Sequence, residues 1–263
     1  MTEQLTEDML VELKRPKYHW AKDTPDERDL KYTVTGTPLP PVVDLRQWAS
    51  PVDDQGDLGS CTGNAIAGAI DLMDNKNYKK NTRVSRLFIY YYERLLEGTV
   101  NQDSGAQIRD GIKVGYTYGA PLEKLWPYYT NHFTRAPSPV AIADAAKRKI
   151  TKYQNAADIT AVKDALAAGF PVVIGFSVYE SFQDPSVANT GNMPMPNVNT
   201  EQLLGGHAVC IVGYDDHKQH FIVRNSWGPD WGDKGYFYMP YGIIQNPQLS
   251  SDFWVIQMSN DPT

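Results

Sequence analysis

A run of small residues that begins at a cysteine places the tightest constraint on the fold. Cys61 is followed by alanine and glycine in residues 65–69, whose short side chains let neighbouring elements approach closely. Ile66, Ile70 and Met73 recur at helical spacing, so we expect a helix packed inside the molecule. A thiol at a helix start lies near the positive end of the helix dipole, which favours the nucleophilic thiolate. The position suits acyl transfer, although a packed core cysteine would fit the same pattern.

A glutamine stands close before this cysteine. Gln55 precedes Cys61 by six residues (61 − 55 = 6), across a short segment that contains two glycines. If its side chain reached back to the sulfur, the amide could donate a hydrogen bond to the oxyanion that forms when the sulfur attacks a carbonyl. The pair is suggestive of catalysis and does not establish it.

The second half of the chain contains a predicted β-hairpin that carries a histidine and an asparagine. Residues 205–214 alternate and include β-branched side chains, and residues 221–227 form a second strand after the polar turn 215–220. Because side chains alternate along a strand, antiparallel pairing brings His207 and Asn225 together on one face. The amide would hold one imidazole nitrogen and leave the other to take a proton from a thiol.

The order glutamine, cysteine, histidine and asparagine resembles that of the papain and cathepsin family of cysteine peptidases. The resemblance spans roughly residues 40–258 and includes a tryptophan-rich loop after the second strand. It implies a two-lobed α+β fold, with a helical left lobe, an antiparallel β-barrel-like right lobe and the active site between them. It also implies four catalytic roles: the oxyanion-hole amide of Gln55, the nucleophile Cys61, the general base His207 and the orienting amide of Asn225.

The same resemblance implies a set of substrate-binding residues. Gly59 would border the pocket beside the nucleophile, and Gly105 would pair its backbone with an extended substrate. The carbonyl of Gly206 would accept a hydrogen bond from the substrate backbone. Trp227 and Trp231 belong to the tryptophan-rich loop, and Trp227 would also shield the histidine–asparagine hydrogen bond from water.

Departures from the family pattern concern the nucleophile helix and the cysteines. Thr62 stands where relatives usually carry tryptophan, and neither Leu58 nor Gln102 is a cysteine, so a disulfide common in secreted relatives is absent. The chain has 2 cysteines, and Cys210, on the strand face opposite His207, is expected in the core. This usage favours a reducing compartment, or a fold that does not depend on disulfides.

The composition favours a compact folded chain. Its 263 residues are 41% hydrophobic and 21% charged, enough for one large two-lobed domain or two small ones. The net charge of −6 argues against a nucleic-acid partner. The longest apolar run, residues 170–178, is too short to span a bilayer, and the first residues lack the features of a signal peptide. We expect a protein that is cytoplasmic, or exported without a Sec signal peptide, with no membrane partner, metal or other cofactor.

Three regions are expected along the chain. Residues 1–40 form an N-terminal extension or abbreviated pro-segment, which starts with a short acidic helix over residues 2–14 and continues with prolines that break helices. Residues 41–150 form the helical lobe that carries the nucleophile. Residues 151–263 form the β-rich lobe that carries the histidine and asparagine. The first region could lie along the cleft as an intramolecular inhibitor, act as a permanent strap, or be a simple ordered extension.

The expected function is hydrolysis of peptide bonds in peptide or protein substrates through a thioester acyl-enzyme. One alternative is another cysteine acyl-transfer enzyme, of the amidase or transglutaminase type. The other is a catalytically silent papain-like module that binds peptides. Asparagine rather than aspartate at position 225 favours the papain type, and the presence of all four polar groups favours an active enzyme.

Overall fold

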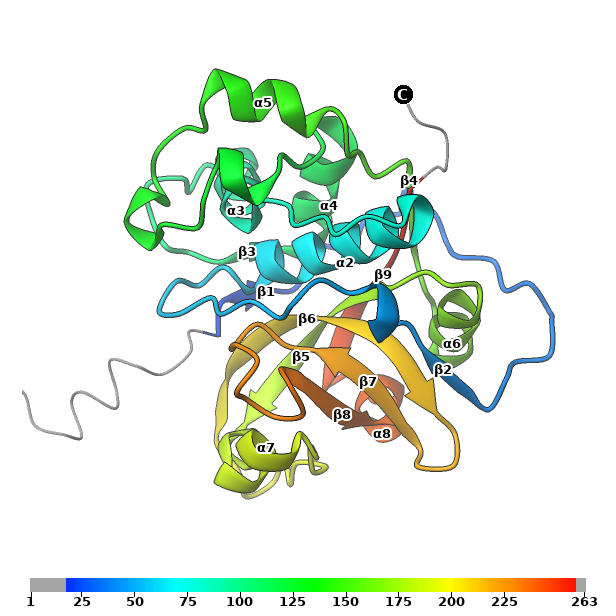
Figure 1. Ribbon diagram of the computed structural model, residues 1–263. Helices are drawn as coiled ribbons and strands as arrows, with labels where there is room; N and C mark the ends of the chain where they lie inside the picture. The colour runs from blue at the N-terminus through cyan, green and yellow to red at the C-terminus, as the bar shows by residue number, and fades with distance from the viewer. Residues whose placement is uncertain (1–17, 259–263) are drawn as a thin grey trace, which may run out of the picture.

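The computed structural model describes residues 18–258, which form a helical lobe packed on a large sheet (Figure 1). The helix expected over residues 2–14 lies outside the described residues. In Figure 1, α2, the helix that begins at Cys61, runs between the sheet and the other helices of the N-terminal half. These helices are α2 (Cys61–Tyr78), α3 (Arg86–Leu96), α4 (Ile108–Thr117) and α5 (Pro139–Ala145). Within residues 18–258, no helix is long and apolar enough to cross a bilayer.

The β-rich lobe is built on a seven-stranded sheet in the described part of the chain. Its strand order is β4-β9-β5-β6-β7-β8, with β2 paired to β6, and every pair is antiparallel. Its strands are β2 (Val42–Asp44), β4 (Lys152–Asn155), β5 (Val172–Tyr179), β6 (Leu203–Asp215), β7 (His220–Arg224), β8 (Tyr236–Pro240) and β9 (Ser250–Gln257). Strand β2 thus joins this sheet although it falls in the range expected to form the helical lobe.

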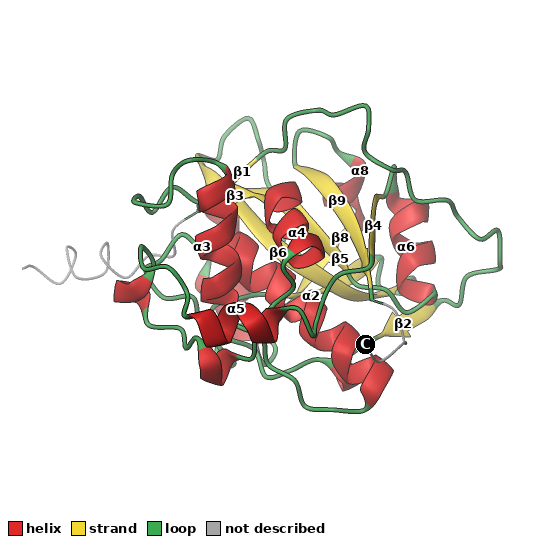
Figure 2. Ribbon diagram, turned by 90° about the horizontal axis from the view of Figure 1, so that it is seen from above, coloured by secondary structure: helices red, strands yellow, loops and turns green. Residues whose placement is uncertain are grey.

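Short elements complete the two lobes. Figure 2 shows α6 at the edge of the sheet, away from α3 and α5. In Figure 1, α7 lies at the lower left, below the strands, and α8 lies behind β7 and β8. The short α-helices of the β-rich lobe are α6 (Ile159–Ala167), α7 (Pro185–Thr190) and α8 (Tyr241–Gln245). Short 3-10 helices occur at Arg46–Trp48, Glu123–Leu125, Thr130–His132 and Glu180–Gln183. Together the elements form the α+β arrangement of two lobes that the sequence predicts.

The small residues of α2 are needed where neighbours come closest. A Cβ atom at Gly63 would lie 2.8 Å from the Arg86 carbonyl oxygen, so α3 packs against the helix backbone there. A Cβ at Gly68 would lie 2.8 Å from Nε of Arg224, a residue of β7. The same guanidinium donates from Nη2 to the carbonyl oxygen of Pro51 at 2.7 Å. Arg224 therefore links the β-rich lobe to the segment that leads into α2.

The hairpin of β6 and β7 forms in the predicted place, with Cys210 opposite Arg224. The prediction that the second strand continues through residue 227 is wrong, because β7 ends at Arg224. Beyond that point the carbonyl oxygen of Ser226 accepts a hydrogen bond from the backbone N–H of Gln55 at 2.8 Å. The chain leaves the sheet because its backbone pairs with the loop of the other lobe.

Residues 18–41 run across the body and are called the strap here. Its first part, residues 18–21, is called the cleft segment. Strand β1 (Trp20–Ala21) in this segment pairs in parallel with β3 (Ala106–Gln107), beside the start of α2 (Figure 1). His19 forms a parallel bridge with Gly206 of β6. The cleft segment therefore lies between the two lobes and pairs with both.

Buried polar groups anchor the strap after the cleft segment. Asp23 accepts hydrogen bonds from Nε1 of Trp254 at 2.7 Å and from the backbone N–H of Arg109 at 3.1 Å. Burial, with the nearby carboxylate of Asp252, raises the pKa of Asp23 to about 7. Further along, the hydroxyl of Tyr32 donates to a carboxylate in α6 at 2.8 Å. These contacts make the later strap an integral part of the body.

Candidate active site

The thiol of Cys61 is completely buried at the first residue of α2. Burial raises the pKa of Cys61 to about 11, although the backbone N–H groups of Ala208, His19 and Thr62 face the sulfur and lower that pKa. The helix start alone predicts a stabilised thiolate. In this structure the neutral thiol is favoured instead, because the sulfur is buried away from water.

The imidazole of His207 is held by one nitrogen. Its Nε2 lies 2.8 Å from Oδ1 of Asn225, and that oxygen also accepts the backbone N–H of Ser226 at 2.8 Å. Because Oδ1 is an acceptor in both contacts, Nε2 carries the proton and Nδ1 is the basic nitrogen. Nδ1 is buried and has no hydrogen-bond partner within residues 18–258. Burial lowers the pKa of His207 to about 4, so the neutral imidazole is favoured.

Two tryptophans pack one behind the other next to the imidazole of His207. The ring of Trp227 stacks on His207, with centroids 5.0 Å apart and an interplanar angle of 21°. Trp231 packs edge-on against Trp227 at 5.0 Å and also contacts Phe182. Trp227 thus lies where the shielding role was expected. Trp231 packs behind it, with ring contacts to Phe182, Trp227 and Phe237.

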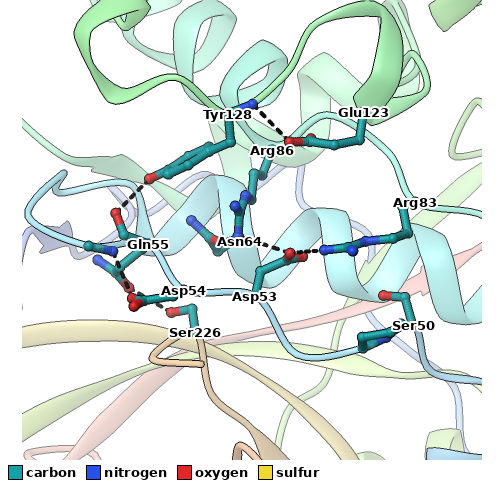
Figure 3. A network of polar contacts seen from close by, with 12 residues as sticks. Ser50, Asp53, Asp54, Gln55, Asn64, Arg83, Arg86, Glu123, Tyr128 and Ser226 are labelled. Carbon is teal, nitrogen blue, oxygen red and sulfur yellow. Dashed lines mark hydrogen bonds and ion pairs between the residues drawn. The ribbon is translucent and has the colours of Figure 1, made fainter. Parts of the chain in front are cut away.

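The side chain of Gln55 is buried, and both ends of its amide are hydrogen-bonded. Figure 3 shows the residue close to Ser226 and Tyr128. Its Nε2 donates to the carbonyl oxygen of Leu58 at 3.0 Å, and its Oε1 accepts from the hydroxyl of Ser226 at 2.6 Å. The backbone carbonyl of Gln55 accepts from the hydroxyl of Tyr128 at 2.9 Å. A fixed amide N–H close to the nucleophile helix is what an oxyanion hole requires, because it needs no rearrangement during the reaction.

The role of Tyr128 predicts a measurable effect on turnover. Its hydroxyl donates to the backbone carbonyl of Gln55 and lies 2.5 Å from Oγ of Ser60, the residue before Cys61. The guanidinium of Arg86 lies 3.9 Å from the centroid of the tyrosine ring. We expect Tyr128→Phe to lower kcat for peptide hydrolysis about fivefold, since one such hydrogen bond contributes ~1 kcal/mol. Tyr129→Phe, at a 57% exposed neighbour, is the matched control. Equal kcat values for the two variants would contradict this positioning role.

All three glycines expected to meet substrate contact the cleft segment. A Cβ atom at Gly59 would lie 2.4 Å from Nδ1 of His19, and a Cβ atom at Gly105 would lie 1.8 Å from the backbone carbonyl oxygen of His19. Gly105 also has a φ of +69°, a conformation that other residues rarely adopt. A Cβ at Gly206 would lie 2.6 Å from Cε3 of Trp20. The cleft segment therefore occupies the positions that the sequence assigns to a substrate.

Thr62, which stands where relatives usually carry tryptophan, has a hydrogen-bond partner that the sequence did not reveal. Its hydroxyl donates to Oε1 of Glu93 at 2.5 Å. Glu93 lies on α3 and is completely buried, and burial raises its pKa well above the usual value. A threonine at this position thus pairs with one oxygen of a carboxyl group packed against α2, while the other oxygen, Oε2, has no hydrogen-bond partner within residues 18–258. The signal in the sequence was only one acidic residue, placed between Tyr92 and Arg94 of α3.

Other contributors were also missed because their partners are distant in sequence. Neither Ser226 nor Tyr128 stands out from the sequence as a contributor to the site. The cleft segment was considered only as one possible path of the first region. Its contacts with the two lobes depend on which residues the fold brings together, which local patterns do not encode.

Sequence comparisons match most of the chain to one family of proteins. A family model described as papain family cysteine protease matches residues 39–255. An uncharacterized peptidase C1-like protein of Acanthamoeba polyphaga mimivirus is 42% identical, over 93% of this chain and 88% of that protein. The thiol protease aleurain of Arabidopsis thaliana is 29% identical, over 80% of this chain and 58% of that protein.

A solved structure shows the same fold. The crystal structure of xylellain, a cysteine protease from Xylella fastidiosa, is 44% identical, with a TM-score of 0.83 over 92% of this chain and 96% of that one. The two-lobed α+β architecture agrees with this structural match, and the family model covers more than half of the chain. The chain belongs to the papain family of cysteine proteases.

Proposed function

We propose that this protease cleaves peptide bonds with Cys61 as nucleophile, His207 as general base, Asn225 as the orienting amide and Gln55 in the oxyanion hole. The observation that carries the assignment is the 2.8 Å contact between Nε2 of His207 and Oδ1 of Asn225. This contact leaves Nδ1 of His207 as the basic nitrogen. The next residue, Ala208, directs its backbone N–H at the Cys61 sulfur. Sulfur and base thus belong to one site.

The proposed reaction proceeds through a thioester. The proton of the Cys61 thiol passes to Nδ1 of His207, and the thiolate attacks the substrate carbonyl carbon. The oxyanion accepts hydrogen bonds from Nε2 of Gln55 and from the backbone N–H of Cys61. The imidazolium then protonates the leaving amine as the C–N bond breaks. Water, deprotonated by His207, attacks the thioester and releases the acid and the thiol.

The cleft segment is proposed to inhibit this reaction intramolecularly. It pairs with β3 and bridges β6, so a substrate has to displace it before reaching Cys61. With the segment in place, the pKa of Cys61 is about 11 and that of His207 is about 4, both because of burial. The covered site therefore holds a thiol and a neutral imidazole. The reactive ion pair requires the water and space that departure of the segment would provide.

Release of the cleft segment does not require release of the whole strap. Tyr18 is held in the cleft by a hydrogen bond of 2.7 Å from Nε2 of Gln183 and by edge contacts with His207 and Trp227. The anchors at Asp23 and beyond lie on the far side of the segment. Residues 18–21 can thus swing out while the later strap keeps its place, which divides the proposed region 1–40 into an inhibitory part and a structural part.

This proposal is tested by weakening the cleft segment in the full chain. Trp20→Ala removes the indole that packs in the cleft, and Leu30→Ala, at a 64% exposed strap residue, is the control. We expect Trp20→Ala to raise kcat/KM for a fluorogenic peptide about tenfold or more, because burial of a large aromatic side chain stabilises the covered state by ~3 kcal/mol. The same rate for both variants and the parent chain would overturn the inhibitory role. Absence of hydrolysis in every form would overturn the peptidase assignment.

A further inference from the structure

Arg86 is buried where α3 packs against the first turn of α2. Its guanidinium lies 3.9 Å from the ring centroid of Tyr128, and its Nη1 donates to Oδ1 of Asn64 at 3.2 Å. Figure 3 shows Arg86 close to both of these partners. One cationic side chain of α3 therefore contacts both the ring of Tyr128 and an amide of α2.

Asn64 and Tyr128 meet at Ser60, the residue before Cys61. Nδ2 of Asn64 donates to Oγ of Ser60 at 3.0 Å and to the carbonyl oxygen of the same serine at 2.9 Å. Oγ of Ser60 lies 2.5 Å from the hydroxyl oxygen of Tyr128, and that hydroxyl donates to the carbonyl oxygen of Gln55 at 2.9 Å. Because the tyrosine hydroxyl has a single proton, which it gives to Gln55, the proton between the two hydroxyls belongs to Ser60.

These contacts form one directed chain of hydrogen bonds, which is called the arginine relay here. It consists of Arg86, Asn64, Ser60, Tyr128 and the carbonyl oxygen of Gln55. Each middle member accepts on one side and donates on the other, so each hydrogen bond polarises the next. The first bond is charge-assisted, and such bonds are stronger than neutral ones. Burial raises the pKa of Tyr128 to about 12, and hydrogen bonding to Ser60 and the charge of Arg86 act against that rise.

We propose that Arg86 is a positioning residue that fixes both oxyanion donors through the arginine relay. The proposal rests on the proposed function, in which the donors are Nε2 of Gln55 and the backbone N–H of Cys61. The end of the relay holds the backbone of Gln55. Its middle holds Ser60, whose carbonyl carbon is bonded to the nitrogen of that N–H. A shift at either point would move a donor away from the developing oxyanion, and small displacements of this kind are costly to turnover.

A neighbouring arginine provides the matched control. Arg83 and Arg86 both pair with Oδ1 of Asp53, and their side chains are 43% and 11% exposed. The guanidinium of Arg83 bonds to Asp53, whereas that of Arg86 also contacts Asn64 and Tyr128. Arg83→Met therefore removes an ion pair at this carboxylate. Arg86→Met removes an ion pair at the same carboxylate and, in addition, the first member of the relay.

The experiment measures kcat and KM for fluorogenic peptides in the full chain carrying Trp20→Ala. We expect Arg86→Met to lower kcat about tenfold and to change KM less than about twofold, because the relay acts on donors used in the transition state. Arg83→Met should lower kcat less than about twofold. Arg86→Lys keeps the charge and a donor for Asn64 but loses the planar stack on Tyr128, so its kcat should lie between those of Arg86→Met and the Trp20→Ala chain.

A double substitution tests whether Arg86 acts through the relay. Tyr128→Phe breaks the relay at its last step, with an expected loss in kcat of about fivefold. If both residues act through one chain, the double variant should lose about tenfold, no more than Arg86→Met alone. Independent roles would multiply the two losses to about fiftyfold. That larger loss, or equal kcat values for folded Arg86→Met and Arg83→Met chains, would overturn the proposal. If Arg86→Met does not fold, Arg86→Lys replaces it, and a kcat equal to that of the Trp20→Ala chain would overturn the proposal.

Amide hydrogen exchange gives a readout that does not depend on turnover. The backbone N–H groups of Gln55 and Ser60 are both hydrogen-bonded to backbone carbonyl groups, so their exchange reports on the segment that the relay holds. Arg86→Met should speed this exchange about tenfold, and Arg83→Met less than about twofold. Exchange unchanged by Arg86→Met would overturn the relay even if no peptide is hydrolysed. Faster exchange in Arg86→Met alone, with no hydrolysis in any chain, would count against the proposed function and leave the relay standing.

Discussion

Replacing Cys61 with alanine is expected to abolish peptide hydrolysis and to leave the fold in place. The thiol is the only proposed nucleophile, so kcat should fall by roughly 10⁴-fold or more. The side chain is buried and small, and the substitution removes one sulfur atom, which costs ~1 kcal/mol of unfolding free energy. Hydrolysis is measured with a fluorogenic peptide, and folding by thermal unfolding, in the parent and Trp20→Ala chains.

The second cysteine supplies the matched control. Cys210 is also completely buried, and burial raises its pKa to about 12. It lies in β6 opposite Arg224, within the sheet. Cys210→Ala should therefore keep the activity of the parent chain while losing a similar amount of stability. Activity retained by Cys61→Ala, or lost in a folded Cys210→Ala chain, would contradict the assignment of the nucleophile.

Replacing His207 with glutamine is expected to lower kcat about 10³-fold or more. Glutamine can still hydrogen-bond to Asn225, but it cannot take the thiol proton or return it to the leaving amine. Asn225→Ala should cost less, because the imidazole would remain and only its orientation would be lost. The measurement is kcat as a function of pH in the Trp20→Ala background.

The control for this substitution is His217→Gln, at an exposed position in the turn between β6 and β7. It should leave kcat unchanged. If His207→Gln kept parental turnover, or if Asn225→Ala proved more damaging than His207→Gln, the proposed base and its orienting amide would be misassigned.

The parts of the fold that the sequence predicts are those with strong local periodicity. The helix at Cys61 and the hairpin of β6 and β7 are confirmed, because their apolar spacing is a local feature. Ser85 accepts a hydrogen bond from the backbone N–H of Phe88, as its place before an apolar run predicts. The end of β7 was misplaced because it depends on Gln55, about 170 residues earlier.

The residues of the candidate site also differ in how well the sequence predicts them. Gln55, Cys61, His207 and Asn225 are recognisable because each belongs to a short motif. The cleft segment is not, because its position depends on glycines scattered over both lobes. Gly175 is an example: nothing in the sequence around it shows that Trp20 lies above it. Such contacts become visible only once the chain is folded.

The division of the first region follows from the same contacts. The boundary near residue 40 remains a prediction, and the strap supports a finer division of the region. Asp23 and Tyr32 are tied to buried or partly buried groups of the body. Loss of an anchor such as Asp23 would leave Nε1 of Trp254 without its acceptor, which is costly in a buried site. Removal of the entire strap would thus damage the fold, and displacement of the cleft segment alone would not.

The central claim is that one site holds Cys61 and His207 beneath the cleft segment, and its most direct test is the rate of Cys61 alkylation by iodoacetamide across pH. A pKa of about 11 in the covered site means that little thiolate exists at neutral pH, and the thiolate fraction rises only as pH approaches that value. The parent chain should therefore react slowly at neutral pH, and Trp20→Ala about tenfold faster or more, with His207→Gln abolishing that gain. Equally rapid alkylation of Cys61 at neutral pH in the parent and Trp20→Ala chains, unaffected by His207→Gln, would contradict the account.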